Sequence, residues 1–335
     1  MTGDRLPPTY VEGFHNRDDV MKMKYNRLGN TGLQVSVLGF GASSLGSVFH
    51  ETDDDEAIQV VYKAIKSGIN IIDVAPWYGH GKAETILGQA LRDIPRQAYY
   101  LTTKVGRYQP KLDEMFDFTA ERTMRSVNES LQRLGLNYVD IIQIHDMEFA
   151  PNLDVILNDT LWALQRVKDS GKAKFIGITG YPMDNFRIKM SNKNKLTTIT
   201  GVTISQEKNV AVMNAAPISM GLLSNRGPPS WHPATDDIKD ACKEAAKYCQ
   251  DKGVDISKLA MHFTLDHDEI PTTFVSTASL SILESNLACV HEKLSTLETN
   301  TMADVMNRYF RPLGNKTWEG IEVANYWRQL ETMKN

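Results

Sequence analysis

Short apolar runs alternate with longer amphipathic segments along most of this chain. The apolar runs lie in VSVLGFGA, near 69–75, 99–105, 139–145 and 175–180, and later in NVAVMNAA and TTFVST. Between the first five runs, apolar residues recur at helical spacing, as in DDDEAIQVVYKAIKSG and TAERTMRSVNESLQRLG. Strands that alternate with helices at roughly 30–40 residues per unit predict βαβ units and a parallel sheet. Further helical patterns follow around 236–252, 256–266, 279–294 and 298–310.

The interval 181–208 breaks this alternation. A helix-like segment, DNFRIKMSNKNK, precedes LTTITGVTI, and only Ser205 to Lys208 separates that run from NVAVMNAA. A parallel crossover needs about a dozen residues or more, so four cannot carry one. Either LTTITGVTI is not a barrel strand, or the two runs pair in some other way. An eight-fold barrel would need helix, strand and helix here, and the pattern supports seven strands well.

The composition is that of an ordinary globular protein. The 335 residues are 41% hydrophobic and 23% charged, with a net charge of -4. Length alone suggests two domains, but α/β barrels often exceed about 250 residues as one. We therefore expect an amino-terminal extension over 1–22 and a single barrel domain with carboxy-terminal helices over 23–335.

Several classes of protein are excluded by what the sequence lacks. The slightly negative net charge does not suit binding to nucleic acid or to an anionic membrane. No apolar run approaches the roughly 18 residues of a membrane-spanning helix. The polar amino terminus holds no signal-peptide core. Cys242, Cys249 and Cys289 form an odd set without metal-type spacing, so we expect idle thiols and no metal site. A cytoplasmic, reducing setting is the simplest interpretation.

Four polar residues follow the ends of three predicted strands. Asp73 and Tyr78 lie in INIIDVAPWYGH, Lys104 in YYLTTKV, and His145 ends VDIIQIH. In a parallel barrel the carboxyl ends of all strands share one face, where catalytic groups collect. We therefore expect a carboxylate, a phenol, an ammonium and an imidazole on one rim.

These four groups suit proton transfer to or from a carbonyl or alcohol oxygen. A free tyrosine, with a pKa of about 10, is a poor acid and a worse base near neutrality. The Lys104 ammonium is expected to lower the pKa of Tyr78, with Asp73 holding the ammonium in place. His145 can orient the substrate oxygen as a neutral or charged donor. The structural alternative is an Asp73–Lys104 ion pair beside an aromatic lid.

Several motifs resemble the aldo-keto reductases. These are KYNRLGNTGLQVSVLGFG, DVAPWYGHGKAETILGQAL, TKVGR, RSVNESLQRLGLNYVDIIQIHD and GKAKFIGITGYP; MNAAPISMGLLSNRGPPSWHPA and CKEAAKYCQDKGVDISKLAMHF are similar more narrowly to the family's L-galactose dehydrogenase branch. The resemblance covers roughly residues 24–325. It implies an α/β fold, a (β/α)8 TIM barrel, here lacking about one β/α unit around strand 6. It also implies that Tyr78 is the general acid/base, that Lys104 and Asp73 tune it, and that His145 orients the substrate.

The same resemblance implies a nicotinamide dinucleotide and places its contacts. Asp73 and Thr179 match positions near the nicotinamide. The loop that runs along the pyrophosphate in the family corresponds to Ser219, Gly221 and Leu222. Asn286 matches a residue that contacts the adenine. Positions that usually carry basic residues for a 2′-phosphate read Ser276 and Ile282. Without Lys or Arg there, an added phosphate has no charge partner, which favours NAD over NADP. The aromatic that often stacks on the nicotinamide falls at Ala215.

The implied reaction is oxidation of a sugar at its anomeric hydroxyl, C1, to a lactone by hydride transfer. The branch implies L-galactose as substrate and a monomer as the working form. One alternative is a broad aldehyde or ketone reductase. Another is a catalytically weak, cofactor-binding regulatory or truncated isoform, because the short 181–208 interval departs from the family pattern.

Overall fold

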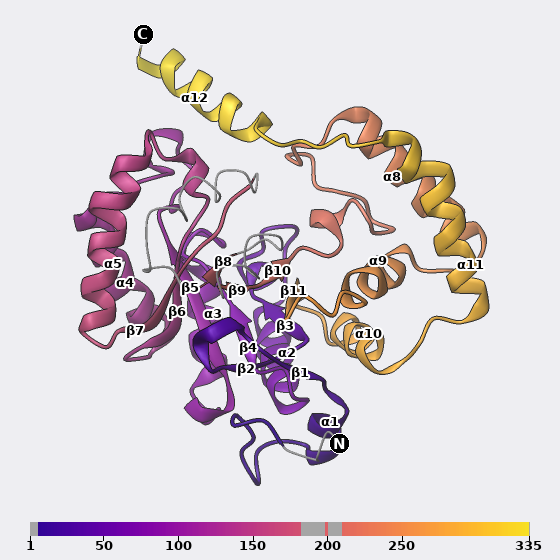
Figure 1. The fold of residues 1–335 in the computed structure, drawn as a ribbon, viewed down its shortest axis with the longest axis horizontal. Helices are drawn as coiled ribbons and strands as arrows, with labels where there is room; N and C mark the ends of the chain where they lie inside the picture. Colours follow the sequence, from indigo (N-terminus) through magenta and orange to yellow (C-terminus); the bar gives the residue numbers. More distant parts are fainter. Residues whose placement is uncertain (1–5, 182–197, 200–209, 335) are drawn as a thin grey trace.

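A parallel sheet that curls into a barrel forms the centre of the computed structural model (Figure 1). The structure describes residues 6–181, 198–199 and 210–334. The strands are β1 (Tyr25–Arg27), β2 (Gln34–Ser36), β3 (Leu38–Gly41), β4 (Ile71–Asp73), β5 (Tyr100–Val105), β6 (Val139–Ile144), β7 (Ala173–Ile178), β8 (Thr198–Ile199), β9 (Ala211–Val212), β10 (Asn214–Ala215) and β11 (Thr273–Ser276). The α-helices are α1 (Arg17–Lys22), α2 (Asp54–Lys66), α3 (Lys82–Leu91), α4 (Ala120–Leu134), α5 (Leu161–Asp169), α8 (Asp236–Asp251), α9 (Ile256–Leu265), α10 (Leu280–His291), α11 (Thr296–Val305) and α12 (Ile321–Lys334).

The order of the strands returns to its starting point. The nine-stranded sheet runs β10–β11–β3–β4–β5–β6–β7–β8–β9, and neighbouring strands are parallel. Only Met213 separates β9 from β10, so both ends of this order lie on one extended segment, 211–215. Counting β9 and β10 as one strand reduces nine to eight, the strand number of a TIM barrel. The predicted fold class is confirmed.

Strand β8 resolves the irregular interval in the sequence. Thr198 and Ile199, inside LTTITGVTI, pair in parallel with Gly177 and Ile178 of β7 on one side and with β9 on the other. LTTITGVTI therefore supplies a barrel strand, and the alternative that it is no strand is wrong. β8 covers Thr198–Ile199 and β9 begins at Ala211, while residues 200–209 lie outside the described part of the chain. A strand therefore occupies the place around strand 6 where about one β/α unit was expected to be missing, and the helix expected over 184–195 lies outside the described residues.

The outer helices begin and end where their capping residues predict. The Asp53 side chain accepts a hydrogen bond from the Glu56 amide at 2.8 Å and starts α2, whose acidic first turn suits a helix amino terminus. Thr119 caps α4 in the same way, and Gly135 ends it in the left-handed conformation. Figure 1 shows α4 and α5 outside β6 and β7, while α9 and α10 lie on the side of β11, and α10 packs against α2. In the described ranges no helix is both long and apolar enough to cross a membrane.

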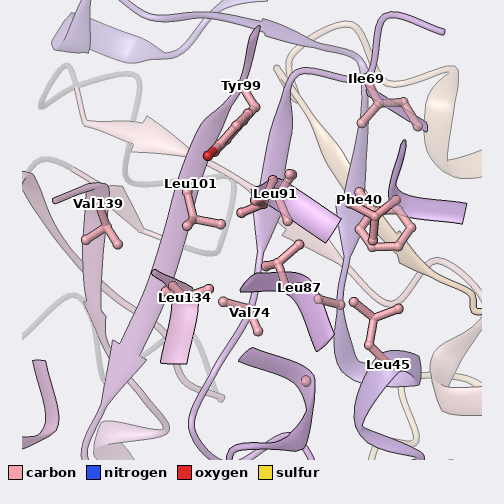
Figure 2. Close-up of a cluster of buried hydrophobic side chains, with 14 of the residues drawn as sticks. Phe40, Leu45, Ile69, Val74, Leu87, Leu91, Tyr99, Leu101, Leu134 and Val139 are labelled. Carbon is pink, nitrogen blue, oxygen red and sulfur yellow. The ribbon is translucent and has the colours of Figure 1, made fainter. Parts of the chain in front are cut away.

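The main core fills the space between the sheet and these helices. Figure 2 shows Phe40 and Leu101 from the strands meeting Leu87 and Leu91 of α3 and Leu134 of α4. All five side chains are buried. Each fully buried aliphatic side chain contributes about 1.5–3 kcal/mol, so this layer holds the strands in register and thereby positions the rim residues.

A second apolar cluster fills the barrel interior. Ile71, Ile141, Met213 and Phe274 meet there, and Leu28 and its neighbours from the β1–β2 hairpin close the cluster from below. The Asn70 side chain accepts from the Ser36 amide at 2.7 Å, which ties the hairpin to the amino end of β4. Because the amino end is plugged, the carboxyl end is the open end of the barrel.

Residues 6–22 lie against the closed end. Thr9 is buried, and its hydroxyl accepts a hydrogen bond from Asn70 Nδ2 at 2.9 Å. The ring of Phe14 meets that of Tyr62 on α2, with centroids 5.5 Å apart. The division into an extension and one domain remains a prediction.

Candidate active site

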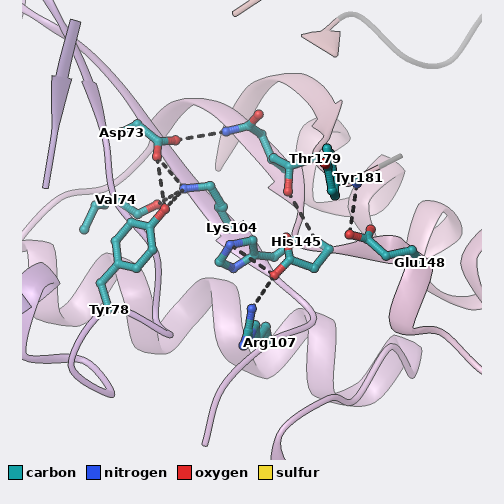
Figure 3. A network of polar contacts seen from close by, with 11 residues as sticks. Asp73, Val74, Tyr78, Lys104, Arg107, His145, Glu148, Thr179 and Tyr181 are labelled. Carbon is teal, nitrogen blue, oxygen red and sulfur yellow. Dashed lines mark hydrogen bonds and ion pairs between the residues drawn. The ribbon is translucent and has the colours of Figure 1, made fainter. Parts of the chain in front are cut away.

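Strand register brings the four predicted polar residues to one rim. Gly41 of β3 pairs with Asp73 of β4, and Asp73 with Thr102 of β5. Two residues further along β5, Lys104 pairs with Gln143 of β6, and His145 follows the end of that strand. These positions lie at the carboxyl ends of adjacent parallel strands, as the sequence predicted, and the structure brings all four side chains together (Figure 3).

Lys104 Nζ is the centre of the cluster. It donates to Asp73 Oδ2 at 2.5 Å, to the Tyr78 hydroxyl at 3.0 Å and to the Val74 carbonyl at 3.1 Å. The Tyr78 hydroxyl is also 3.5 Å from Asp73 Oδ2. Asp73 and Lys104 are almost fully buried, with 7% and 4% of their surface exposed. Three acceptors around one buried ammonium satisfy it and fix the phenol oxygen beside it.

Two residues beneath Asp73 were missed by the sequence reasoning. Gln143 Nε2 donates to Asp73 Oδ1 at 3.1 Å and to Thr102 Oγ1 at 2.7 Å. The amide therefore orients the carboxylate whose other oxygen receives Lys104. Thr102 and Gln143 occupy inward positions of β5 and β6, and polar side chains at such positions of otherwise apolar strands were the available signal.

Burial sets the protonation of the phenol. Burial raises the pKa of Tyr78, and the nearby Lys104 ammonium offsets only part of that rise. The expectation that Lys104 would leave this pKa below its usual value is therefore wrong, because removal from water penalises the phenolate more than one ammonium stabilises it. Burial alone would lower the pKa of Lys104, but the Asp73 carboxylate outweighs it and raises that pKa. Lys104 is charged and Tyr78 is a neutral phenol at neutral pH.

His145 stands beside Tyr78 as a neutral ring. The two ring centroids are 5.9 Å apart and the planes are perpendicular. Burial lowers the pKa of His145 to about 3, helped by the positive charges of Lys104 and Arg107. Its Nδ1 is buried without a hydrogen-bond partner among the described residues. Of the two predicted forms of this donor, neutral and charged, the structure supports the neutral one.

Two glycines hold the loop that carries Tyr78. A Cβ on Gly46 would lie 2.5 Å from the Tyr78 carbonyl oxygen, and a Cβ on Gly79 would lie 2.3 Å from the Gly46 carbonyl oxygen. Gly79 also has a φ of +63°, which side-chain-bearing residues rarely adopt. The loop after β3 and the loop after β4 therefore touch backbone to backbone, which fixes the height of Tyr78 above the rim.

A further layer of side chains, also missed from the sequence, lies outside the four. Arg107 Nη1 donates to Asp146 Oδ2 at 2.7 Å, and the Arg107 guanidinium lies 4.1 Å from the Trp77 ring centroid. Each of these residues is a near neighbour in sequence of a predicted one, since Trp77 precedes Tyr78 and Asp146 follows His145. TKVGR contains Arg107, IHD contains Asp146 and DVAPWYGH contains Trp77, but no spacing rule assigned them a role.

The predicted cofactor residues lie around the same end of the barrel. Ser276 ends β11 opposite Gly41, and its hydroxyl accepts from the Ser44 amide at 2.7 Å. The Thr179 hydroxyl accepts from the Asp146 amide at 3.2 Å, which connects β7 to the β6 rim. Asn286 on α10 is buried, and its Nδ2 has no partner among the described residues.

The loop from Ser219 to Leu222 has an unusual backbone. Ser219, Met220 and Gly221 have φ values of 49°, 52° and 99°, all left-handed, and Leu222 is buried. The amides of three of these residues are used within the turn: Ser219 N–H donates to the Ala216 carbonyl at 2.8 Å, Gly221 N–H to the Ile218 carbonyl at 3.1 Å and Leu222 N–H to the Ser219 carbonyl at 3.2 Å. Ala215, where the family often has an aromatic, is exposed and offers no ring for stacking.

A separate cavity of about 760 Å³ opens beside the site, between the start of α4 and the carboxy-terminal helix α12. Its apolar wall includes Phe116, Phe149 and Tyr326, whose rings contact one another, and Phe116 also faces Arg107. No group of three or more His, Cys, Asp or Glu side chains suited to a metal ion occurs among the described residues.

Known proteins resemble the chain over most of its length. The model of the Aldo/keto reductase family matches residues 37–307. L-galactose dehydrogenase of Arabidopsis thaliana is 41% identical over 316 residues, covering 89% of this chain and 97% of that protein. D-arabinose 1-dehydrogenase of Saccharomyces cerevisiae is 30% identical over 262 residues, covering 69% and 75%. The solved structure of aldo-keto reductase AKR11C1 from Bacillus halodurans, in its holo form, matches with a TM-score of 0.68 at 26% identity, covering 84% and 96%.

Proposed function

Because the chain belongs to the aldo/keto reductase family of oxidoreductases, which use nicotinamide cofactors, we propose that it oxidises an aldose at C1 to the lactone with NAD. We propose L-galactose as the substrate, since the 41% identical relative is an L-galactose dehydrogenase and the 30% identical one a D-arabinose 1-dehydrogenase. The observation that carries the proposal is the contact of Lys104 with both the Tyr78 hydroxyl and Asp73.

In the proposed mechanism the sugar hydroxyl at C1 lies between Tyr78 and His145. His145, as a neutral donor, holds the oxygen, and Tyr78, once it has lost its own proton and is a phenolate, takes the hydroxyl proton as the C1–H bond breaks. The bound nicotinamide would supply the hydride acceptor. Loss of the proton and the hydride turns the C1–OH of the cyclic sugar into the C=O of a lactone, so atoms and electrons balance. Lys104, held by Asp73, whose other oxygen accepts from Gln143, stabilises the phenolate form of Tyr78 from which this proton uptake starts.

The protonation of Tyr78 gives the two reaction directions different pH dependence. A phenol whose pKa is raised by burial is ready to donate a proton to a carbonyl oxygen. It must first lose that proton to act as a base, so sugar oxidation should accelerate as the pH rises. Broad aldehyde or ketone reduction is therefore the second candidate function, and the neutral phenol is the observation that favours it.

The residues near the rim fit a dinucleotide. A buried amide N–H₂ without a partner is costly, so the Asn286 side chain is explained if an acceptor on a bound ring completes it. For the loop from Ser219 to Leu222 the support is its place after β10, since the amides of Ser219, Gly221 and Leu222 already donate to carbonyls within the turn. Ser276 and the half-exposed Ile282 place no cation where a 2′-phosphate would need one, which supports NAD over NADP.

The test is NADH formation with a panel of aldoses, in the wild type and in Tyr78→Phe. We expect L-galactose to be oxidised and the variant to lose about 10²–10⁴-fold in kcat, the usual contribution of a general acid or base. NAD binding, followed by protein fluorescence, should stay within about twofold in the variant. Unchanged turnover in Tyr78→Phe would remove the assignment. NADH consumption with simple aldehydes, without sugar oxidation at any pH, would favour the second function. A cytoplasmic monomer remains part of the proposal, and sedimentation would test the monomer.

A further inference from the structure

Asp146 lies between a fixed cation and the candidate donor to the substrate. Its Oδ2 accepts from Arg107 Nη1 at 2.7 Å and is 3.7 Å from His145 Nε2. Burial alone would raise the pKa of Asp146, but the charge of the Arg107 guanidinium, whose Nη1 donates to it, holds that pKa below its usual range. Asp146 is therefore an ionised carboxylate beside His145, the residue that holds the reacting oxygen in the proposed mechanism.

The backbone of Asp146 and its carboxylate are each held in place. Its residue has a φ of 50°, a left-handed conformation that costs energy outside glycine, and the Thr179 hydroxyl accepts from its amide at 3.2 Å. Arg107 is itself held in place, because its guanidinium lies 4.1 Å from the Trp77 ring centroid and 5.2 Å from that of Phe116. The carboxylate that it binds is therefore held as well. A rigid acceptor of this kind loses little freedom when a ligand binds.

One oxygen of this carboxylate is available. Asp146 Oδ1 makes no hydrogen bond within the described part of the chain, and the side chain is 21% exposed on the open side of the rim. An ionised carboxylate only accepts hydrogen bonds, so its natural ligand is a hydroxyl group. A purely structural ion pair would have no need to leave an oxygen free beside the reacting centre.

We propose that Asp146, positioned by Arg107, accepts a hydrogen bond from the hydroxyl on the carbon next to the one that reacts. The site would then select 2-hydroxy aldehydes and aldoses over aldehydes that lack this hydroxyl. This inference rests on the proposed function, because it takes the substrate oxygen to lie between Tyr78 and His145. It adds a specificity-determining residue that the four rim residues do not provide.

The test uses the NAD-loaded Tyr78→Phe protein, in which binding is read without turnover. Dissociation constants of L-galactose, 2-deoxy-L-galactose and 6-deoxy-L-galactose are measured by NMR titration. We expect the 2-deoxy sugar to bind about tenfold to a hundredfold more weakly than L-galactose, since a hydrogen bond to a buried charge is lost. The 6-deoxy sugar should bind within about threefold of L-galactose.

Adding Asp146→Ala should abolish this discrimination and bring the first two sugars within about twofold of each other. Asp146→Asn, which keeps an acceptor oxygen without the charge, should retain part of it. Asp154→Ala is the matched control, because Asp154 is an exposed carboxylate nearby in the chain whose side chain caps no helix. That variant should discriminate like its parent.

Two kinds of result would overturn the inference. If Asp146→Ala weakens both sugars equally, the residue acts through His145 or only on the fold, and the pairing with the adjacent hydroxyl is wrong. If the parent does not discriminate, or binds no sugar, the pairing is also wrong. Failure of the proposed function looks different, because wild-type protein would then form no NADH while the discrimination and its loss in Asp146→Ala persist.

Discussion

Replacing Asp73 by Asn should destabilise the protein and make its stability depend on pH in a new way. The substitution keeps the volume and one acceptor oxygen but removes the charge that faces Lys104 Nζ at 2.5 Å. Lys104, only 4% exposed, would keep the Tyr78 hydroxyl and the Val74 carbonyl as partners, both neutral. Breaking a buried ion pair costs about 3–5 kcal/mol, and the retained acceptor places the expectation near the lower end, about 3 kcal/mol.

The sign of the pH dependence follows from Lys104. In the wild type its pKa is raised by Asp73, so its contribution to stability is complete below the ordinary lysine pKa and is lost only as the pH rises through the raised value. Without the carboxylate, burial lowers the pKa of Lys104 below that of the unfolded chain. The unfolded state then binds more protons, and the free energy of unfolding should rise with pH up to about 10.4.

Urea unfolding followed by tryptophan fluorescence, from neutral to alkaline pH, measures both effects. Asp73→Asn combined with Lys104→Met should recover much of the loss, because it removes the stranded charge. Asp251→Asn is the surface control, since Asp251 and its partner Lys247 are 61% and 73% exposed, and it should cost no more than about 1 kcal/mol. A loss below about 1 kcal/mol in Asp73→Asn, or a stability that does not rise with pH, would refute the account.

Four further outcomes follow from the structure. Because burial lowers the pKa of His145 to about 3, its ring proton signals should show no titration step between about pH 5 and 8 in NMR spectra, and a midpoint near the ordinary value would contradict the neutral donor. Because the pKa of Tyr78 is raised, kcat/KM for sugar oxidation should increase from neutral to alkaline pH, while kcat/KM for carbonyl reduction should stay constant until the pH approaches that raised pKa; a flat oxidation profile would count against it. Gly79→Ala should lower kcat and the melting temperature together, since its Cβ would collide with the Gly46 carbonyl; equal activity would show that the loops can separate. Ile282→Arg should raise the ratio of kcat/KM for NADP to that for NAD about tenfold, as a new charge partner for the phosphate, and an unchanged ratio would place the 2′-position elsewhere.

The sequence predicted the alternation of strands and helices because the relevant signals are local. The apolar run before Asp73 and the capping residues Asp53 and Thr119 act within a few positions of themselves. The four rim residues could be grouped for a related reason. In a parallel sheet the end of each strand fixes the face on which the next residue lies, so Lys104 and His145 had to share a rim if the strands were parallel.

Strand β8 shows the limit of that reasoning. Thr198 and Ile199, inside LTTITGVTI, form β8, which pairs with β7 and β9, whereas the sequence pattern left open whether this run joins the barrel. Strand pairing depends on residues far apart in sequence, and such partners leave no local trace.

What the sequence by itself determined is the order of elements, the parallel sheet and the set of groups on one rim, since each depends on short-range periodicity and on strand ends. What only the tertiary structure decided is how those groups behave. The pKa of Tyr78 is raised rather than lowered because burial is a sum over the whole surrounding fold. Likewise, the Gln143 contact below Asp73 and the Arg107 contact with Asp146 join different strands, so their existence depends on register and packing, which no stretch of sequence contains.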